Sequence, residues 1–412
     1  MVKKVAIITL GCRVNQSESS VIEGSLRQYG ASIVGPDDNP DYCIVNTCTV
    51  TARSDANSRQ LIRRAARSGA RVIVTGCYSE LSPEEASGMG GVCAVVPVSD
   101  KDSIIGYITG RESEPFYNLH DRARPYLKVQ DGCNFSCSYC AVPIARGRSR
   151  SIPVDEAVRR AALIVGGGYH EIVLTGIHLG SYGHDLTPRR NLAYLIRKIL
   201  SETNINRIRL SSIEINEIDD ELIELFSDSR LCRHLHLPLQ SGSDRILAVM
   251  KRHYTSRAFR DKVDRIAGKF RDIAIGTDVI AGFPSESEED FGLTLGVLED
   301  LPFSYLHLFP YSDRKGTTAS NMNLKISDRI ISLRMDALKR LNRAKRDEYA
   351  SSNKGKIVEV IAESGPGDRH TFGTSSNYLK IRVPYSSISK GTLIFVSVVN
   401  ASPESLDGFV IT

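Results

Sequence analysis

The 412-residue sequence has no apolar stretch long enough to cross a membrane, and it contains no low-complexity segment. Its first residues, MVKKVAIITLGC, carry two lysines, but the apolar run that follows them is too short for a secretory segment. We therefore expect a cytoplasmic globular protein without a membrane partner. Its content of 41% hydrophobic and 25% charged residues is ordinary for that class.

Net charge is low, and the cysteine content does not fit a disulfide framework. The formal charge of +5 permits a polyanionic partner without requiring one, so its distribution matters more than its sum. Nine cysteines in a chain that is expected to stay reduced favour metal binding or catalysis.

The first part of the sequence alternates apolar strand patterns with amphipathic helix patterns, which predicts a parallel sheet flanked by helices. Ser82 and Glu85 have the spacing of a capping box and predict the start of a further helix. The other predicted strands are residues 3–10, 42–48 and 70–77, and the predicted helices between them are residues 17–30 and 58–69.

A longer series of strand–helix units follows a turn-rich connection near residues 110–122 and predicts a complete or partial α/β barrel. A basic helical segment over residues 326–350 comes after its last strand. The six predicted strands are residues 126–130, 171–175, 207–212, 234–239, 273–281 and 304–311.

After Lys356 the apolar period changes to two, which predicts a small β-barrel of roughly 60 residues. The expected fold class is therefore α/β with three domains: a parallel α/β domain over 1–112, a partial (β/α)6 barrel over 119–350 and the small β-barrel over 351–412.

Three cysteines are crowded into the stretch DGCNFSCSYC. A disulfide uses two cysteines and a zinc site four ligands, whereas three thiolates on a four-iron cluster leave one iron open for a small molecule. Cys133, Cys137 and Cys140 therefore favour an iron–sulfur cluster, and Tyr139 could pack beside the bound molecule. The alternative is a zinc site completed by a distant ligand, although the nearest histidines, His120 and His170, lack a typical spacing.

A second cysteine trio is dispersed along the sequence. Cys12, Cys48 and Cys77 each follow an apolar strand, and the carboxyl ends of parallel strands share one edge of a sheet, where ligands usually bind. We expect the three to converge there on a second metal cluster; buried apolar cysteines are the alternative. The remaining cysteines, interpreted as core residues, are Cys43, Cys93 and Cys232.

Several longer stretches resemble a known family. CNFSCSYC is similar to the signature of the radical S-adenosylmethionine superfamily. TLGCRVNQSES, VNTCTVTARSDANSRQLIRR and TGCYSE resemble the amino-terminal domain of its methylthiotransferases, and LTGIHLGSYG, RLSSIE, HLPLQSGSDRIL and TDVIAGFPSESEEDF resemble their central domain. The tail is similar to the TRAM domain, a small RNA-binding barrel. GCRVNQ and NTCTVT are most similar to the branch that acts on threonylcarbamoyladenosine in tRNA.

The resemblance implies two 4Fe–4S clusters, one on each cysteine trio, and S-adenosylmethionine on the open iron of the first. Reductive cleavage yields a 5′-deoxyadenosyl radical that removes hydrogen from carbon 2 of the adenine beside the anticodon. The second cluster supplies or carries the sulfur, and a second S-adenosylmethionine provides the methyl group. The implied partners are the tRNA anticodon stem-loop, an electron donor and a sulfur source, and we expect a monomer.

Other functions remain open on the sequence. The same chemistry could act on isopentenyladenosine or on a ribosomal protein, and the chain could instead be a non-catalytic iron–sulfur sensor or a zinc protein that binds RNA.

Loops after barrel strands build the site in such barrels, and ordinary turn chemistry is the alternative for each residue there. The predicted cofactor-binding residues are Tyr139, Thr175, Gly176, Ser212, Glu214, Gln240, Gly282 and Phe283. Alternating cations on extended segments predict phosphate contacts and, with an aromatic ring, base stacking; a solvated polar face is the alternative. The predicted RNA-binding residues are Arg146, Arg148, Arg150, Tyr378, Lys380 and Arg382.

Overall fold

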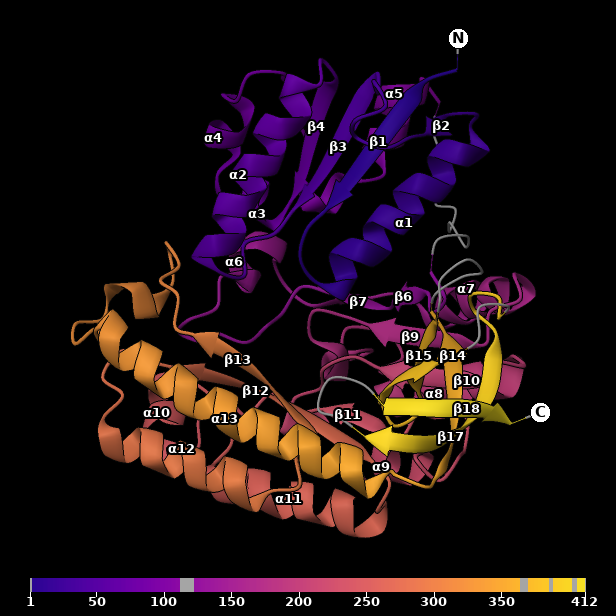
Figure 1. The fold of residues 1–412 in the computed structure, drawn as a ribbon. Helices are drawn as coiled ribbons and strands as arrows, with labels where there is room; N and C mark the ends of the chain where they lie inside the picture. The colour runs from indigo at the N-terminus through magenta and orange to yellow at the C-terminus, as the bar shows by residue number, and fades with distance from the viewer. Residues whose placement is uncertain (1, 112–121, 364–369, 385–387, 402–405, 412) are drawn as a thin grey trace. The chain divides into compact units, whose positions relative to one another are not determined.

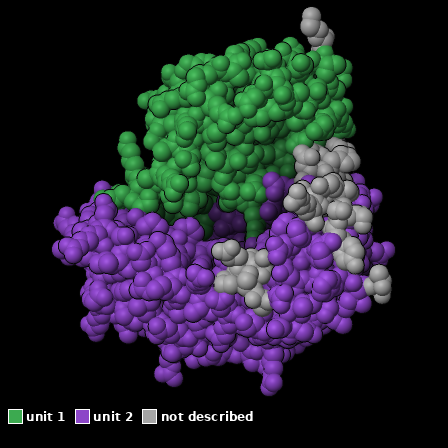
Figure 2. Space-filling view, in the orientation of Figure 1, with its two compact units in different colours: residues 1–121, 130–150, 312–320 green, residues 122–129, 151–311, 321–412 purple. Residues whose placement is uncertain are grey.

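The computed structural model describes residues 2–111, 122–363, 370–384, 388–401 and 406–411. The chain divides into two compact units (Figure 2). Unit 1 comprises residues 1–121, 130–150 and 312–320, and unit 2 comprises residues 122–129, 151–311 and 321–412.

This division differs from the three predicted domains in two respects. The cysteine-rich segment 130–150 belongs to the unit that contains the amino-terminal sheet, and the carboxy-terminal barrel belongs to the unit that contains the central strands. The predicted boundaries at 112 and 119 lie outside the described residues.

The sheet of unit 1 is parallel and has the strand order β2-β1-β3-β4-β5 (Figure 1). Neighbouring strands pair in register, so that Ile7 lies opposite Ile44, which lies opposite Ile73. The five strands are β1 (Lys4–Thr9), β2 (Ser32–Ile33), β3 (Tyr42–Thr47), β4 (Arg71–Gly76) and β5 (Val92–Val95).

Alternate residues of β3 enter two different hydrophobic clusters. Ile44 packs with Ile22 and Leu26 of α1, whereas Val45 packs with Ile62 of α2. Because successive side chains of a strand point to opposite faces, both faces of this sheet are covered, and β3 is buried along its whole length. The helices of unit 1 are α1 (Arg13–Gln28), α2 (Ala52–Arg67), α3 (Cys77–Leu81), α4 (Pro83–Ser87), η1 (Val98–Asp100), α5 (Ser103–Thr109) and α6 (Val142–Arg146).

Unit 2 contains two three-stranded parallel sheets, of order β10-β9-β6 and β11-β12-β13. An isolated parallel bridge between Ile208 and Leu231 links the end of one sheet to the segment that enters the other. The six predicted strands of a partial barrel are thereby confirmed as β6 (Tyr126–Lys128), β9 (Glu171–Thr175), β10 (Arg207–Leu210), β11 (His234–His236), β12 (Ala274–Ala281) and β13 (Tyr305–Pro310).

Helices alternate with these strands, and the last of them, α13, packs on β12, β13 and α12. The short strands β7 (Gln130–Asp131) and β8 (Arg150–Ser151) precede and follow the cysteine-rich segment. The helices of unit 2 are α7 (Val154–Gly166), η2 (Leu179–Ser181), α8 (Leu192–Glu202), η3 (Ile215–Glu217), α9 (Asp220–Leu225), α10 (Asp244–Val249), α11 (Ser256–Lys269), α12 (Glu288–Asp300) and α13 (Asp328–Ser352). The short η4 (Thr318–Asn321) lies almost entirely in segment 312–320 of unit 1.

The carboxy-terminal strands form a closed five-stranded barrel, as predicted, of order β14-β15-β16-β18-β17. Leu379, Ile381 and Val383 point into its core, in agreement with the alternation in the sequence. The strands are β14 (Ile357–Ala362), β15 (Thr371–Ser375), β16 (Lys380–Val383), β17 (Leu393–Ala401) and β18 (Leu406–Ile411), of which β15 was not predicted. Across the part of the chain that the structure describes, no helix combines the length and the apolar character of a membrane span.

Candidate metal centres

The first cysteine trio lies in unit 1, in the loop between β7 and α6. Cys133, Cys137 and Cys140 are all half-buried, and none of the nine cysteines forms a disulfide bond. The amide of Cys133 donates to the Gly147 carbonyl at 3.1 Å, and the amide of Cys140 donates to the Cys137 carbonyl at 3.1 Å. The Phe135 amide donates to the sulfur of Cys133 at 3.4 Å, which is a contact that supports a thiolate ligand.

Backbone contacts brace this loop at both ends. Gly132 has φ +72°, and a Cβ there would lie 2.1 Å from the carbonyl oxygen of Arg148, so that a side chain cannot be accommodated. The side-chain amide of Gln130 donates to the Gly132 carbonyl at 2.7 Å. At the other end, the Ala319 amide donates to the Ser138 carbonyl at 2.7 Å, so segment 312–320 holds the loop from a distant part of the sequence.

The donor set of this loop fits a multi-iron cluster better than one ion. Among the described residues, the group of three His, Cys, Asp or Glu ligand atoms that lie within 4.8 Å of one another is His236, Asp278 and His307. Three thiols are one fewer than the four ligands of a structural zinc site. Three thiols on one short loop suit a 4Fe–4S cluster with an open iron.

The structure describes one of the two histidines that were considered as zinc ligands. His170 pairs through Nδ1 with Asn206 at 2.9 Å, and His120 lies outside the described residues.

The second trio follows three neighbouring strands of the unit 1 sheet. Cys12 precedes α1 just after β1, Cys48 directly follows β3, and Cys77 directly follows β4. A Cβ on Gly11 would lie 2.7 Å from the sulfur of Cys48. Burial raises the pKa of the Cys48 thiol, and the charges of Cys12 and Cys77 raise it further. The structure therefore brings these three cysteines together at one edge of the sheet, as the parallel arrangement predicts.

Cys77 is buried, like Cys48, and it has a cationic partner. Arg146 donates from Nε to the sulfur of Cys77 at 3.2 Å. Burial raises the pKa of the Cys77 thiol, and Arg146 opposes that rise. Burial alone would lower the pKa of Arg146, but Glu18, Cys77 and Asp131 raise it well above its ordinary value.

Two predictions about single residues are wrong. Arg146 was expected to bind RNA phosphate, but its side chain is fully buried in unit 1; it ends α6, and Gly147 at φ +70° turns the chain before Arg148. Arg148 and Arg150 are exposed. Cys93 was expected in the core with Cys43 and Cys232, but it is exposed and donates its thiol proton to the Val72 carbonyl.

The predicted cofactor-binding loops follow strands of unit 2. Thr175 ends β9 and is buried, with Gly176 half-buried after it, and Ser212 after β10 is exposed. Burial raises the pKa of Glu214, which Arg252 opposes through an ion pair.

Gln240 and Gly282 shape two further loops of unit 2. Gln240 adopts φ +67° and pairs through its backbone with Asp278 and Ile280. The Gly282 amide donates to Glu286 at 2.7 Å, and a Cβ on Gly282 would strike Ile331 of α13.

Phe283 and Tyr139 differ in what they can offer to a ligand. The ring of Phe283 is fully buried and meets Tyr311 edge-on, so only its backbone could face a cofactor. Tyr139 is half-buried beside Cys140.

A histidine–tyrosine cluster on β11–β13 was not predicted as a site. Asp278 lies 2.8 Å from Nε2 of His236 and 3.3 Å from Nδ1 of His307. Burial alone would raise the pKa of Asp278, but these two histidines lower it below its ordinary range. The Tyr305 hydroxyl contacts His234 at 2.8 Å and His236 at 3.1 Å. The sequence signal was the alternation of His234 and His236 along one strand.

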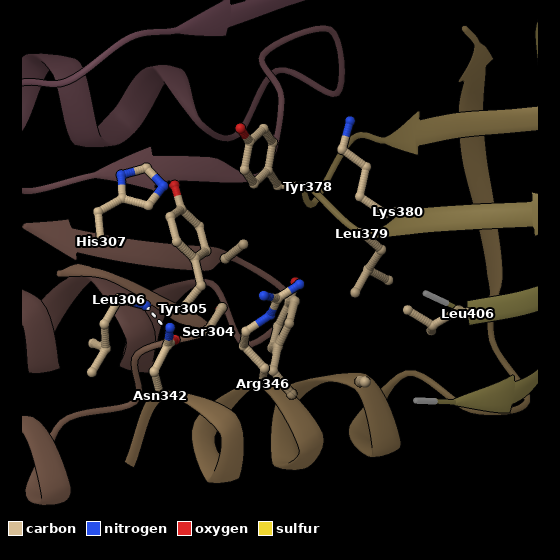
Figure 3. Close-up of a pocket in the computed structure, with 13 residues that line it drawn as sticks. Ser304, Tyr305, Leu306, His307, Asn342, Arg346, Tyr378, Leu379, Lys380 and Leu406 are labelled. Atoms are coloured by element: carbon tan, nitrogen blue, oxygen red, sulfur yellow. Dashed lines mark hydrogen bonds between the residues drawn. The ribbon is translucent and has the colours of Figure 1, made fainter. Parts of the chain in front are cut away.

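Tyr378 precedes β16 and is not part of the strand that carries Lys380 and Arg382, which corrects the predicted alternation of the three. It sits in a turn at φ +64°, and its ring stacks on His234 with centroids 4.1 Å apart. Tyr378 lines a cavity of about 210 Å³ together with Tyr305, Arg346 and Lys380 (Figure 3).

Lys380 and Arg382 of β16 each have an acidic partner within the barrel. Lys380 pairs with Glu363 at 2.9 Å, and Arg382 pairs with Asp407 at 2.7 Å. Both ion pairs are partly exposed, so solvent screens them.

Two family models match this chain. The model of the radical SAM superfamily matches residues 127–298, and that of the uncharacterized protein family UPF0004 matches residues 4–96. These two regions contain the first and second cysteine trio, respectively.

Curated relatives match nearly the whole chain. A protein of Aquifex aeolicus (strain VF5), named threonylcarbamoyladenosine tRNA methylthiotransferase MtaB, is 40% identical over 380 residues, which cover 87% of this chain and 92% of the relative. A protein of the same name from Bacillus subtilis (strain 168) is 36% identical, with 96% of this chain and 94% of the relative covered.

The fold is also found among solved structures. The radical S-adenosylmethionine methyltransferase TsrM from Kitasatospora setae, solved with cobalamin and a 4Fe–4S cluster bound, aligns with a TM-score of 0.57 over 78% of this chain and 77% of that chain. At 16% identity, this similarity concerns the fold alone.

Proposed function

Because this chain belongs to the methylthiotransferase family of the radical SAM superfamily, we propose that it inserts sulfur and transfers a methyl group to carbon 2 of the adenine of threonylcarbamoyladenosine, next to the anticodon of tRNA. The proposed substrate rests on the names of the two relatives, which are 40% and 36% identical to this chain over most of its length. The wider assignment, a radical SAM methylthiotransferase, does not depend on that substrate.

Membership of the superfamily implies one 4Fe–4S cluster and S-adenosylmethionine. Cys133, Cys137 and Cys140 would hold this cluster, since they form a braced loop with three thiols and no fourth protein ligand is needed. When bound, the cluster and S-adenosylmethionine supply a carbon-centred radical that can remove hydrogen from the adenine ring. The chain itself orients the cofactor and excludes water.

A second cluster on Cys12, Cys48 and Cys77 would carry the sulfur that is inserted. The observation behind this part of the proposal is that three cysteines distant in sequence meet at the carboxyl edge of β1, β3 and β4. Buried apolar cysteines would not need to sit at the ends of strands, and one of the three, Cys12, is exposed.

The loops after the strands of unit 2 would bind S-adenosylmethionine and the modified nucleoside. Polar residues at the ends of these strands and in the loops after them, including buried Thr175 and half-buried Glu214, suit a ribose or an amino-acid group. The carboxy-terminal barrel would act as a TRAM-like RNA-binding domain, with Lys380 and Arg382 on its surface and Arg148 and Arg150 on the loop of unit 1.

The proposed reaction also requires an electron donor and a sulfur source. An electron donor and a sulfur source must come from other molecules, because the reaction consumes both. We propose that the enzyme meets its tRNA substrate in the cytoplasm and acts as a monomer.

The test is mass spectrometry of nucleosides from a strain that lacks the gene. Methylthiolated threonylcarbamoyladenosine should disappear and return with the wild-type gene, but not with the Cys133→Ser or Cys77→Ser variant. The Cys77→Ser protein should still form 5′-deoxyadenosine in vitro, whereas the Cys133→Ser protein should not. Cys93→Ser, at an exposed thiol outside both trios, is the matched control and should restore the nucleoside.

Other outcomes point to other functions. Loss of methylthiolated isopentenyladenosine or of a modified ribosomal protein would assign the same chemistry to a different substrate. A reconstituted protein that holds clusters but never forms 5′-deoxyadenosine would instead be an iron–sulfur sensor.

A further inference from the structure

Arg146, which lies six residues after Cys140 of the first cysteine trio, contacts Cys77 of the second trio. It ends α6, a short helix that begins two residues after Cys140 and packs against α3, whose first residue is Cys77 (Figure 1). The Arg146 side chain has no exposed surface, and its Nε donates to the sulfur of Cys77 at 3.2 Å. A residue that follows the first trio therefore contacts a member of the second.

The guanidinium of Arg146 is fixed from three other sides. Nη1 lies 2.9 Å from Glu18 of α1 and 2.9 Å from Asp131 of β7, and Nη2 donates to the side-chain oxygen of Asn15. These contacts leave the planar group one orientation, in which the Nε–H bond faces Cys77. Because a guanidinium keeps its proton in proteins, the charge beside Cys77 is permanent.

We propose that Arg146 is a positioning residue of the second cluster, which holds the thiolate of Cys77 by a charge-assisted hydrogen bond and raises the reduction potential of that cluster. This inference rests on the proposed cluster on Cys12, Cys48 and Cys77. Hydrogen bonds to the ligand sulfurs and nearby charge both set the potential of such clusters. Since reduction adds negative charge, a fixed cation at a ligand sulfur favours the reduced form.

Variants of Arg146 and of its acidic partner Glu18 should shift the reduction potential of the second cluster in opposite directions. Glu18 neutralises part of the guanidinium charge and also pairs with Lys101. Glu18→Gln removes this compensation but keeps the donor to Cys77, so the potential should rise. Arg146→Lys keeps one positive charge but cannot contact Glu18, Asp131, Asn15 and Cys77 together, so the potential should fall.

The experiment uses the full-length chain in which Cys133, Cys137 and Cys140 are replaced by alanine, so that only the second cluster can form. Redox titration with dithionite, followed by electron paramagnetic resonance, measures its potential. We expect a more negative potential for Arg146→Lys and a more positive one for Glu18→Gln. Arg67→Gln removes an exposed arginine of the same unit and should leave the potential unchanged.

A general disturbance of packing cannot reproduce this pattern, because it would shift both variants in the same direction. The parent here is the triple-alanine protein with no further substitution. If Arg146→Lys has the same potential as this parent, or if both variants shift in the same direction, the role of Arg146 is overturned, but the second cluster is not excluded. If the parent binds iron at none of its remaining cysteines, the second cluster and the inference fail together. Circular dichroism of each variant checks that the chain is folded.

Discussion

Arg209 of β10 binds the fully buried carboxylate of Glu171 on the neighbouring strand β9, with 2.7 Å between Nε and Oε1. Arg207 approaches the same carboxylate at 2.6 Å, and all three side chains have no exposed surface. The guanidinium groups of both arginines also donate to backbone carbonyls of the carboxy-terminal barrel, including those of Thr374 and Ser375. Glu171 thus supports the contact between the partial barrel and the small barrel within unit 2.

Replacement of Glu171 by glutamine should destabilise unit 2. The variant leaves two buried guanidinium groups without their common counter-charge, and loss of one partner from a buried ion pair typically costs about 3–5 kcal/mol. The urea midpoint of unfolding should fall accordingly. Glu156→Gln, whose partners on α7 are the exposed Arg159 and the half-buried Arg160, should change the free energy of unfolding by at most about 1 kcal/mol, because Glu156 is partly exposed. Equal losses in the two variants would contradict the role of burial.

The same carboxylate should make stability depend on pH in the acid range. Burial alone would raise the pKa of Glu171, but Arg207, Arg209 and Arg124 lower it below its ordinary value. A depressed folded-state pKa adds stability that is complete above the unfolded value of about 4.3 and is lost as the pH falls toward the folded value. The difference in unfolding free energy between wild type and Glu171→Gln should therefore shrink below about pH 4. A difference that stays constant down to pH 3 would contradict this assignment.

Gly11→Ala should damage the second cysteine trio. Gly11 and Gly30 both have positive φ, so alanine strains the backbone at either position, but only at Gly11 does the new Cβ meet a neighbour, Cys48, at 2.7 Å. With two four-iron clusters, the iron content of the reconstituted Gly11→Ala protein should fall from about eight toward about four per chain. Gly30→Ala, with open space around its Cβ, should keep the full content. Iron analysis of both variants tests this prediction, and an equal iron content in the two variants would contradict it.

Gly276→Ala should displace Tyr305 from the histidine cluster. An added Cβ would lie 2.0 Å from the ring of Tyr305, whose hydroxyl contacts His234 and His236. Overpacking of this kind typically costs about 1–3 kcal/mol, measurable as a lower urea midpoint. Gly292→Ala is the control: it lies within α12 with no neighbour near the new Cβ, and alanine there should stabilise by up to about 1 kcal/mol. An unchanged midpoint for Gly276→Ala would show that the ring can move freely.

Removal of the two cations of β16 should weaken tRNA binding. If Lys380 and Arg382 bind phosphates, Lys380→Ala/Arg382→Ala should reduce the slope of log affinity against log salt by about 1 for each phosphate that the variant no longer binds. The matched control is Arg159→Ala/Lys198→Ala, which removes two exposed, ion-paired cations from α7 and α8. Equal slopes for both double variants, measured by filter binding at several salt concentrations, would exclude a specific role for β16.

The periodicity of the sequence predicted the strands well because their apolar residues alternate or run continuously between turn residues. β9, expected over residues 171–175, is observed as Glu171–Thr175, and the other strands of the partial barrel begin within two residues of the expected positions. The convergence of Cys12, Cys48 and Cys77 followed from the rule that parallel strands end at one edge. The short strand β15 was missed, since TFGTS contains a glycine and only one large apolar side chain.

Side-chain direction beyond regular elements could not be predicted from spacing. The arginines of ARGRSRS were interpreted as one extended row, but Arg146 ends a helix, and the positive φ of Gly147 reverses the chain before Arg148. Tyr378 was placed in the alternation of β16, but it precedes the strand in a left-handed turn and packs inward. In both cases one residue with positive φ broke the pattern. Gly147 is a glycine, for which this conformation is common, whereas Tyr378 is a non-glycine, for which the sequence gives no clear signal.

Segment 312–320 has a consequence for the synthesis of this protein. Arg314 contacts Thr49 and Asp55, and Ala319 binds the carbonyl of Ser138 in the cysteine loop. As the chain emerges from the ribosome, the amino-terminal sheet can assemble early, but the segment that braces its cysteine loop arrives only when residue 320 has been translated. The cysteine loop therefore reaches its braced form only after more than three quarters of the chain has been synthesised.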